Sequence, residues 1–180
     1  PGEHKYKFEG DKAAYVRLFP KTSEGQPKIG RSVIKNVVHH KGSLAPMSYA
    51  ITGVTSANDF GWACIDPSQN TTTKNICQAF PSGELWGVTS QVFMQTQVRH
   101  FVRPDEAATA FGAIAVEKLC TRTLDSFVRV ASTVMQLRPP FVVELGIVGT
   151  KGAYMGAPHP EFPNGSYYGP IRDDSLVRRY

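Results

Sequence analysis

Residues 104–137, PDEAATAFGAIAVEKLCTRTLDSFVRVASTVMQL, are the most strongly patterned stretch of this 180-residue chain. Apolar residues recur there every three or four positions, which is the spacing of one face of an α-helix. Pro104 suits the first helical position, and Asp105-Glu106 suit the positive end of the helix dipole. Gly112 is a point where the helix could divide. The pattern predicts one long helix over about 104–137, with these apolar residues on one face: Ala113, Val116, Cys120, Leu124, Phe127, Ala131 and Val134.

Short β-branched and aromatic runs lie on both sides of this helix. Residues 13–19, AAYVRLF, end at Pro20 and predict a strand with Tyr15, Arg17 and Phe19 on one face. Two further runs flank Pro81-Ser82-Gly83 and predict a hairpin. Other strands are expected at 60–65, 92–94, 141–148 and from about 175, with a turn at 149–152 and a loop between 158 and 170. Together these elements predict an α+β fold, in which a mainly antiparallel sheet packs against the long helix.

A smaller basic helix is predicted at about residues 29–40. Ile29, Val33 and Val37 fall at four-residue spacing, and Gly42 supplies a stop. The residues beside that apolar face are mostly basic. They are the candidate nucleic-acid-binding residues: Lys28, Arg31, Lys35, His39, His40 and Lys41.

Basic charge is concentrated near the N-terminus. The formal net charge is +5 and the sequence pI is about 9.2, and residues 1–41 contain nine Lys or Arg against four acids. Such a cluster can contact phosphates in a sequence-independent, salt-sensitive way. A solvated helix face that aids solubility is the alternative, and the sequence leaves both open.

Composition excludes two classes of protein. Hydrophobic residues make up 41% and aromatic residues 11%, which rules out wholesale disorder. No apolar stretch approaches the roughly 20 residues that a membrane helix needs. We expect a linker or arm over residues 1–12 and a single α+β domain over 13–180. The chain begins without Met and stops just after an apolar-basic run, so we expect a fragment of a larger protein.

No catalytic residue, metal site or cofactor is predicted. Cys64, Cys77 and Cys120 lie among apolar or small residues, so we expect them to pack in the core. Their odd number, without a signal peptide, favours a reducing, cytoplasmic location. His39 and His40 are adjacent, so on a helix their side chains diverge by about 100° and cannot easily share a metal ion.

Several motifs occur in the order found in a family of bacterial proteins. Residues 14–20, AYVRLFP, resemble the YLRLIP strand of that family, and residues 82–88, SGELWGV, are similar to its GEIW hairpin. Residues 139–152 and 169–171 resemble its PPY…G…GVKG…GP tail. These proteins carry an N-terminal Schlafen/AlbA-type domain described as ATP-binding or DNA-binding. The resemblance implies a C-terminal accessory domain of a cytosolic prokaryotic protein concerned with nucleic acid, in regulation or in antiphage defence.

We therefore expect a non-enzymatic accessory domain that contacts nucleic-acid backbone through the basic helix. The alternatives are an oligomerisation or ligand-sensing module without nucleic-acid contact and, less favoured, a nucleic-acid hydrolase. Expected partners are DNA or RNA, the N-terminal domain of the same parent protein and a second copy of the chain, with no membrane. The strand around residues 176–178 would offer an edge for strand pairing.

Overall fold

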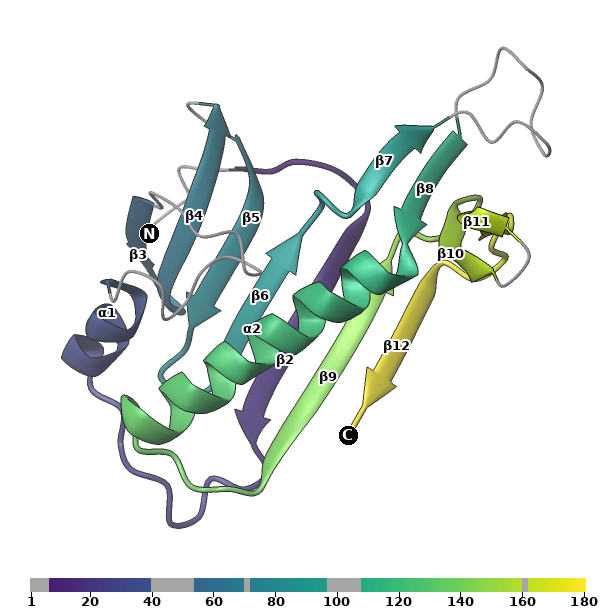
Figure 1. The fold of residues 1–180 in the computed structure, drawn as a ribbon. Coiled ribbons are helices and arrows are strands. Elements are labelled where there is room, and N and C mark those ends of the chain that lie inside the picture. The colour runs from purple at the N-terminus through teal and green to yellow at the C-terminus, as the bar shows by residue number, and fades with distance from the viewer. Residues whose placement is uncertain (1–6, 40–53, 70–71, 97–107, 160–161) are drawn as a thin grey trace.

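The computed structural model describes residues 7–39, 54–69, 72–96, 108–159 and 162–180 (Figure 1). They form an α+β fold, as the sequence predicts. The twelve strands and two helices of this part of the chain are β1 (Lys7–Phe8), β2 (Ala13–Pro20), α1 (Arg31–His39), β3 (Val54–Asn58), β4 (Gly61–Gln69), β5 (Thr72–Ala79), β6 (Leu85–Thr89), β7 (Phe93–Thr96), β8 (Ala108–Gly112), α2 (Ala113–Thr133), β9 (Phe141–Val148), β10 (Tyr154–His159), β11 (Phe162–Tyr168) and β12 (Ser175–Arg179).

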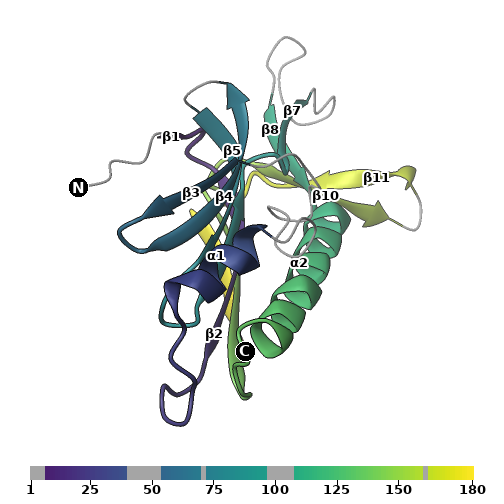
Figure 2. The same cartoon turned by 90° about the vertical axis from the view of Figure 1, so that its left-hand side faces the viewer.

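The main sheet has the strand order β12-β9-β2-β6-β5-β4-β3, and each neighbouring pair along this path is antiparallel. β1 lies within the stretch expected as a linker and adds to the sheet by pairing in parallel with β5. Residues of both helices join one hydrophobic core over one face of the sheet (Figures 1 and 2). The prediction of a mainly antiparallel sheet is confirmed.

Strand β2 lies between β6 and β9 and separates an apolar face from a polar one. Ala14, Val16 and Leu18 are fully buried in the core that also contains the α2 side chains. The fully buried side chains of Val16 and Leu18 each contribute about 1.5–3 kcal/mol. Tyr15 and Arg17 lie on the other face, because successive strand residues point to opposite sides.

Helix α2 is shorter than predicted. Residues Ala108–Gly112, expected to be helical, form β8 and pair with β7 and with β10. Gly112 has an extended backbone (φ −88°, ψ 121°), so the helix begins directly after it. Sheet pairing therefore overrides the helical spacing at 108–112, while residues 104–107 lie outside the described part of the chain.

The buried face of α2 is broader than the predicted one. The helix contacts β2 and also β8 and β10, so two adjacent rows of its side chains are covered. The buried side chains are Val116, Leu119, Cys120, Thr123, Phe127, Val130 and Ala131. Four of these belong to the predicted face. Thr123 is accommodated in the core because its hydroxyl donates to the Leu119 carbonyl oxygen at 2.8 Å.

The short helix α1 begins at Arg31, two residues later than predicted. The carbonyl oxygen of Gly30 accepts hydrogen bonds from the N–H groups of Val33 and Ile34, which closes the first turn. Ile34 and Val37 are buried and anchor the helix over β4 and β5. Ile29 lies before the helix.

A second, four-stranded sheet has the order β11-β10-β8-β7. Its β10–β11 hairpin occupies most of the stretch that the sequence predicted as a loop. The expected turn at 149–152 is present, with both glycines at positive φ. No helix in the described ranges has the length and apolar character needed to cross a membrane.

The chain leaves α2 through a left-handed residue. Gln136 has φ 55°, and the N–H of Leu137 donates to the carbonyl oxygen of Ala131 at 2.8 Å. A left-handed backbone costs an L-residue about 1–2 kcal/mol that glycine avoids. This turn sends Leu137 back into the core, where its side chain is buried.

We predict that Gln136→Gly stabilises the protein by about 0.5–1 kcal/mol, because relief of the left-handed strain outweighs the added freedom of the unfolded chain. Urea denaturation followed by circular dichroism measures the change. Ser132→Gly is the matched control, because Ser132 is exposed within α2 and glycine there should destabilise by a similar amount. Equal destabilisation by both variants would contradict the prediction.

Candidate functional site

The basic residues of α1 divide between exposed positions and positions that the structure does not describe. Lys28, Arg31 and Lys35 are exposed. His39 ends the helix, but its side chain is outside the described set, as are His40 and Lys41 altogether. Burial of Ile34 and Val37 on the sheet side turns Arg31 and Lys35 away from the core, since they lie on another stripe of the helix.

A hollow of about 410 Å³ lies between α1 and the β3–β4 hairpin. Arg31, Ser32 and Lys35 line one side, and Trp62 and Asp59 line the other. The Lys35 ammonium nitrogen lies 5.8 Å from the centre of the Trp62 ring, within range of a cation–π contact. The fold therefore places Trp62 of β4 beside Arg31 and Lys35 of α1, although Trp62 is far from both in the sequence.

The β3–β4 turn that carries this hollow is held by specific contacts. Asn58 Oδ1 accepts hydrogen bonds from the Phe60 N–H at 2.9 Å and from Gln78 Nε2 at 3.2 Å. Gly61 has φ +150°, and a Cβ there would lie 2.1 Å from the Ala79 carbonyl oxygen. Only glycine fits at this position, and its presence lets β4 approach β5 immediately before Trp62.

More cations lie near the start of α1. Gln26 Nε2 donates to the Arg138 carbonyl oxygen, and the Arg138 N–H donates to Gln26 Oε1, both at 2.9 Å. The Lys21 N–H donates to the Pro140 carbonyl oxygen. This bond also joins the loop between β2 and α1 to the segment between α2 and β9. These bonds hold the loop before α1 against the segment that follows α2, and Lys21, Lys28 and Arg138 on these two stretches are exposed.

A second polar cluster lies on the sheet face opposite α2. Arg17 pairs with Glu84 Oε1, and Trp86 Nε1 donates to the same oxygen. The Arg17 guanidinium carbon lies 4.7 Å from the ring centre of Phe19 and 5.5 Å from that of Trp86. The hydrogen bond that Arg17 donates to Glu84 is the main reason that the pKa of Arg17 is raised above its ordinary value. Because this cation already has a carboxylate partner, we assign the cluster to stability.

Tyr15 and Glu144 extend this cluster across β2 and β9. Tyr15 donates its hydroxyl to Glu144 Oε1 at 3.1 Å, and burial followed by this bond raises the pKa of Tyr15. The Tyr15 ring lies on Gly146, where a Cβ would come within 2.3 Å of a ring carbon. Strand alternation predicts Tyr15 and Arg17 on one face, but their acidic partners come from β9 and from the turn before β6.

The three cysteines are buried, as expected for core residues. Cys64 and Cys77 face each other across β4 and β5, which their spacing in the sequence does not indicate. Burial raises the pKa of the Cys120 thiol to about 11, so it is protonated at neutral pH and a poor nucleophile. Within the described ranges, no three His, Cys, Asp or Glu residues come close enough to hold a metal ion.

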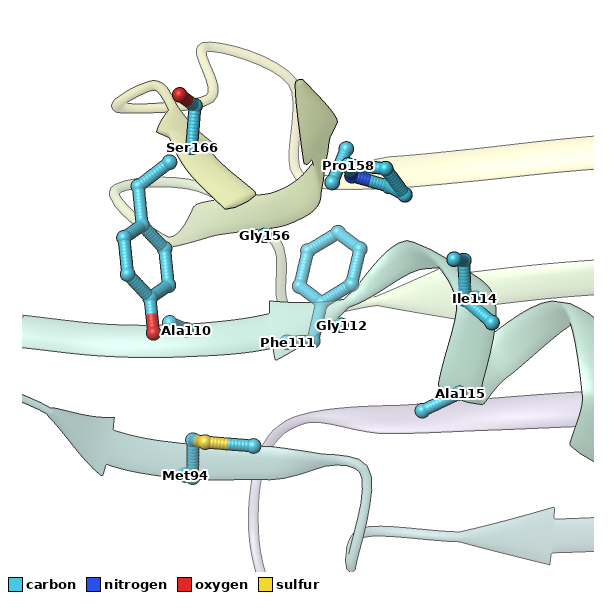
Figure 3. A pocket seen from close by; sticks show the side chains of 11 residues that line it. Met94, Ala110, Phe111, Gly112, Ile114, Ala115, Gly156, Pro158 and Ser166 are labelled. Carbon is cyan, nitrogen blue, oxygen red and sulfur yellow. The ribbon is translucent and has the colours of Figure 1, made fainter. Parts of the chain in front are cut away.

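A further hollow, of about 340 Å³, lies where the small sheet meets the start of α2 (Figure 3). Figure 3 shows Met94 from β7, Phe111 from β8 and Ile114 from α2 around it. No charged side chain lines it among the residues that the structure describes. It therefore offers apolar contact without the charges that the α1 hollow provides.

We predict that Glu84→Gln destabilises the protein by about 1 kcal/mol, because it removes the charge that pairs with the partly exposed Arg17. For a chain of this size the melting temperature should fall by about 2–4 °C. Glu117→Gln, at an exposed position of α2, is the control and should change stability by less than about 0.5 kcal/mol. If thermal denaturation gives both variants the same melting temperature, the Arg17–Glu84 ion pair contributes nothing to stability.

The comparisons with known proteins name no relative. No family model, curated protein or solved structure matches this chain. The function must therefore be inferred from the side chains that the fold brings together. The α1 hollow brings together two cations and an aromatic ring, Arg31, Lys35 and Trp62.

Proposed function

We propose that this domain binds nucleic acid at the α1 hollow, as a non-enzymatic accessory part of a bacterial nucleic-acid-associated protein. One observation carries the proposal: the exposed cations Arg31 and Lys35 line the same hollow as the Trp62 ring. Cations pair with phosphates, and aromatic rings stack with bases whatever the base sequence. The hollow therefore supplies the two kinds of contact that a nucleotide chain can use.

The spacing of these groups favours a single strand over a duplex. Arg31 and Lys35 are four residues apart, so they are separated by about 6 Å along the helix axis and can meet neighbouring phosphates. Trp62 can stack only on a base that is not already stacked between neighbours in a duplex. We therefore propose single-stranded DNA or RNA as the preferred ligand, with Lys28 as a further phosphate contact.

The hollow gives little support to a hydrolase. Among the described residues that line it, Asp59 supplies the one carboxylate. General acid–base or two-metal hydrolysis needs several acids or histidines that converge on the scissile bond. Asp59 also opposes phosphate binding, so the two cations must outweigh one acid.

The family resemblance supports the same proposal. The motifs at 14–20, 82–88, 139–152 and 169–171 imply a C-terminal accessory domain of a Schlafen/AlbA-type parent protein. Such a parent would act in the cytoplasm, in gene regulation or in antiphage defence. Its N-terminal domain would be a partner of the domain described here.

We predict that Arg31→Ala with Lys35→Ala weakens binding of a fluorescein-labelled oligonucleotide in anisotropy titrations. Loss of two single-strand phosphate contacts should reduce the slope of log K against log salt by about 1.4. Trp62→Leu should weaken binding about 5- to 150-fold, because one base–aromatic stack contributes about 1–3 kcal/mol. In a Trp86→Phe background, oligonucleotide should quench the remaining Trp62 fluorescence.

Lys118→Ala with Arg122→Ala is the matched control. It removes the same charge at the same helical spacing from exposed positions of α2 that do not line the hollow. If both double variants weaken oligonucleotide binding equally, the loss follows from the lower net charge alone, and this result would contradict the α1 site. No binding by the wild-type domain at low salt would contradict nucleic-acid binding itself.

A further inference from the structure

Strand β12 forms one edge of the main sheet. Among the described strands it pairs with β9 alone, and all five of its residues are exposed. Three large apolar side chains lie on it or directly after it, with exposed fractions of 40% for Leu176, 46% for Val177 and 74% for Tyr180. An exposed edge with unpaired backbone groups is a template for another strand.

The hydrogen bonds to β9 show which backbone groups of β12 face outward. Tyr180 and Val143 exchange both of their N–H to carbonyl bonds, at 2.8 and 3.0 Å. Such pairs alternate along an antiparallel ladder, so Leu176 and Arg178 also direct their backbone groups toward β9. The backbone groups of Ser175, Val177 and Arg179 therefore point to the open edge.

The charges around β12 identify the strand that would fit there. Asp173 and Asp174 precede the strand, Arg178 and Arg179 end it, and all four are exposed. A partner strand would have to place arginines opposite Asp173 and Asp174, and acids opposite Arg178 and Arg179. An antiparallel copy of residues 173–179 does so, whereas a parallel copy would set like charges against each other.

We propose that two copies of this chain pair through antiparallel β12 strands about a two-fold axis at Leu176. In this register Asp173 faces Arg179 of the second copy, and Asp174 faces Arg178 of the second copy. Symmetry repeats both pairs, so four ion pairs surround a central Leu176–Leu176 contact. The two sheets become one continuous sheet.

An apolar hollow beside the edge strengthens this arrangement. The hollow, of about 320 Å³, is lined by Leu176, Arg178 and Tyr180 together with Cys120 of α2 and Leu145 of β9. Leu176 thus belongs both to the open edge and to an apolar surface on the helix side. Pairing centred on Leu176 places a second leucine next to this surface and withdraws apolar area from water.

The first test removes a single hydrogen-bond donor from the open edge. Sedimentation velocity over a concentration series, without nucleic acid, should show that the wild-type chain dimerises. Val177→Pro should weaken dimerisation at least about tenfold, because it removes an outward N–H and leaves the bonds to β9 intact. Val177→Ala keeps that N–H and should stay within about threefold of wild type. A monomeric wild type, or a dimer that Val177→Pro does not weaken, would overturn the proposal.

The second test uses the self-complementary charges. Asp173→Arg with Asp174→Arg, and separately Arg178→Glu with Arg179→Glu, should each give a folded monomer by circular dichroism and sedimentation. An equimolar mixture of the two should form a heterodimer, because every arginine then faces an acid. Dimers of either variant alone, or a mixture that stays monomeric, would overturn the antiparallel register.

Discussion

The alternation of side chains along β2 is the constraint on which the rest of the structure depends. Val16 and Leu18 are fully buried against the core, while Arg17 between them carries a charge to the opposite face. A shift of one residue would put Arg17 into the core and the two aliphatic side chains into water. Because β2 pairs with both β6 and β9, its register fixes those of its neighbours. The β2 register then places Glu84 beside Arg17 and Glu144 beside Tyr15.

The same burial rule produces the candidate binding surface. Helix α1 is held by two side chains, Ile34 and Val37, and their burial leaves Arg31 and Lys35 on the open side. The indole at this surface arrives with β4, whose approach to β5 depends on Gly61. The site thus depends on two features: the amphipathic pattern of α1, which is local in sequence, and the close packing of β4 on β5, which is tertiary.

The two proposed surfaces lie at different ends of the sheet order. β12 is one terminal strand, and β3, whose hairpin borders the α1 hollow, is the other. Strand pairing at one edge therefore leaves the hollow near the other edge open. A dimer would present two such hollows, and one nucleotide strand long enough to reach both would gain avidity without any new contact.

The sequence by itself determined the α+β class, the β2 alternation, the hairpin strand predicted at 84–88 and four of the buried α2 residues, because these depend on spacing within one element. Tertiary structure decided the start of α2 at Ala113, since Ala108–Gly112 gain strand partners that no local pattern reveals. It also decided the β10–β11 hairpin and the meeting of Trp62 with Lys35. The physical reason is the distance in sequence over which each signal acts. Periodicity indicates which side of a single helix or strand is apolar. Hydrogen bonds and ring contacts between distant residues form only when the strands have paired in the folded sheet.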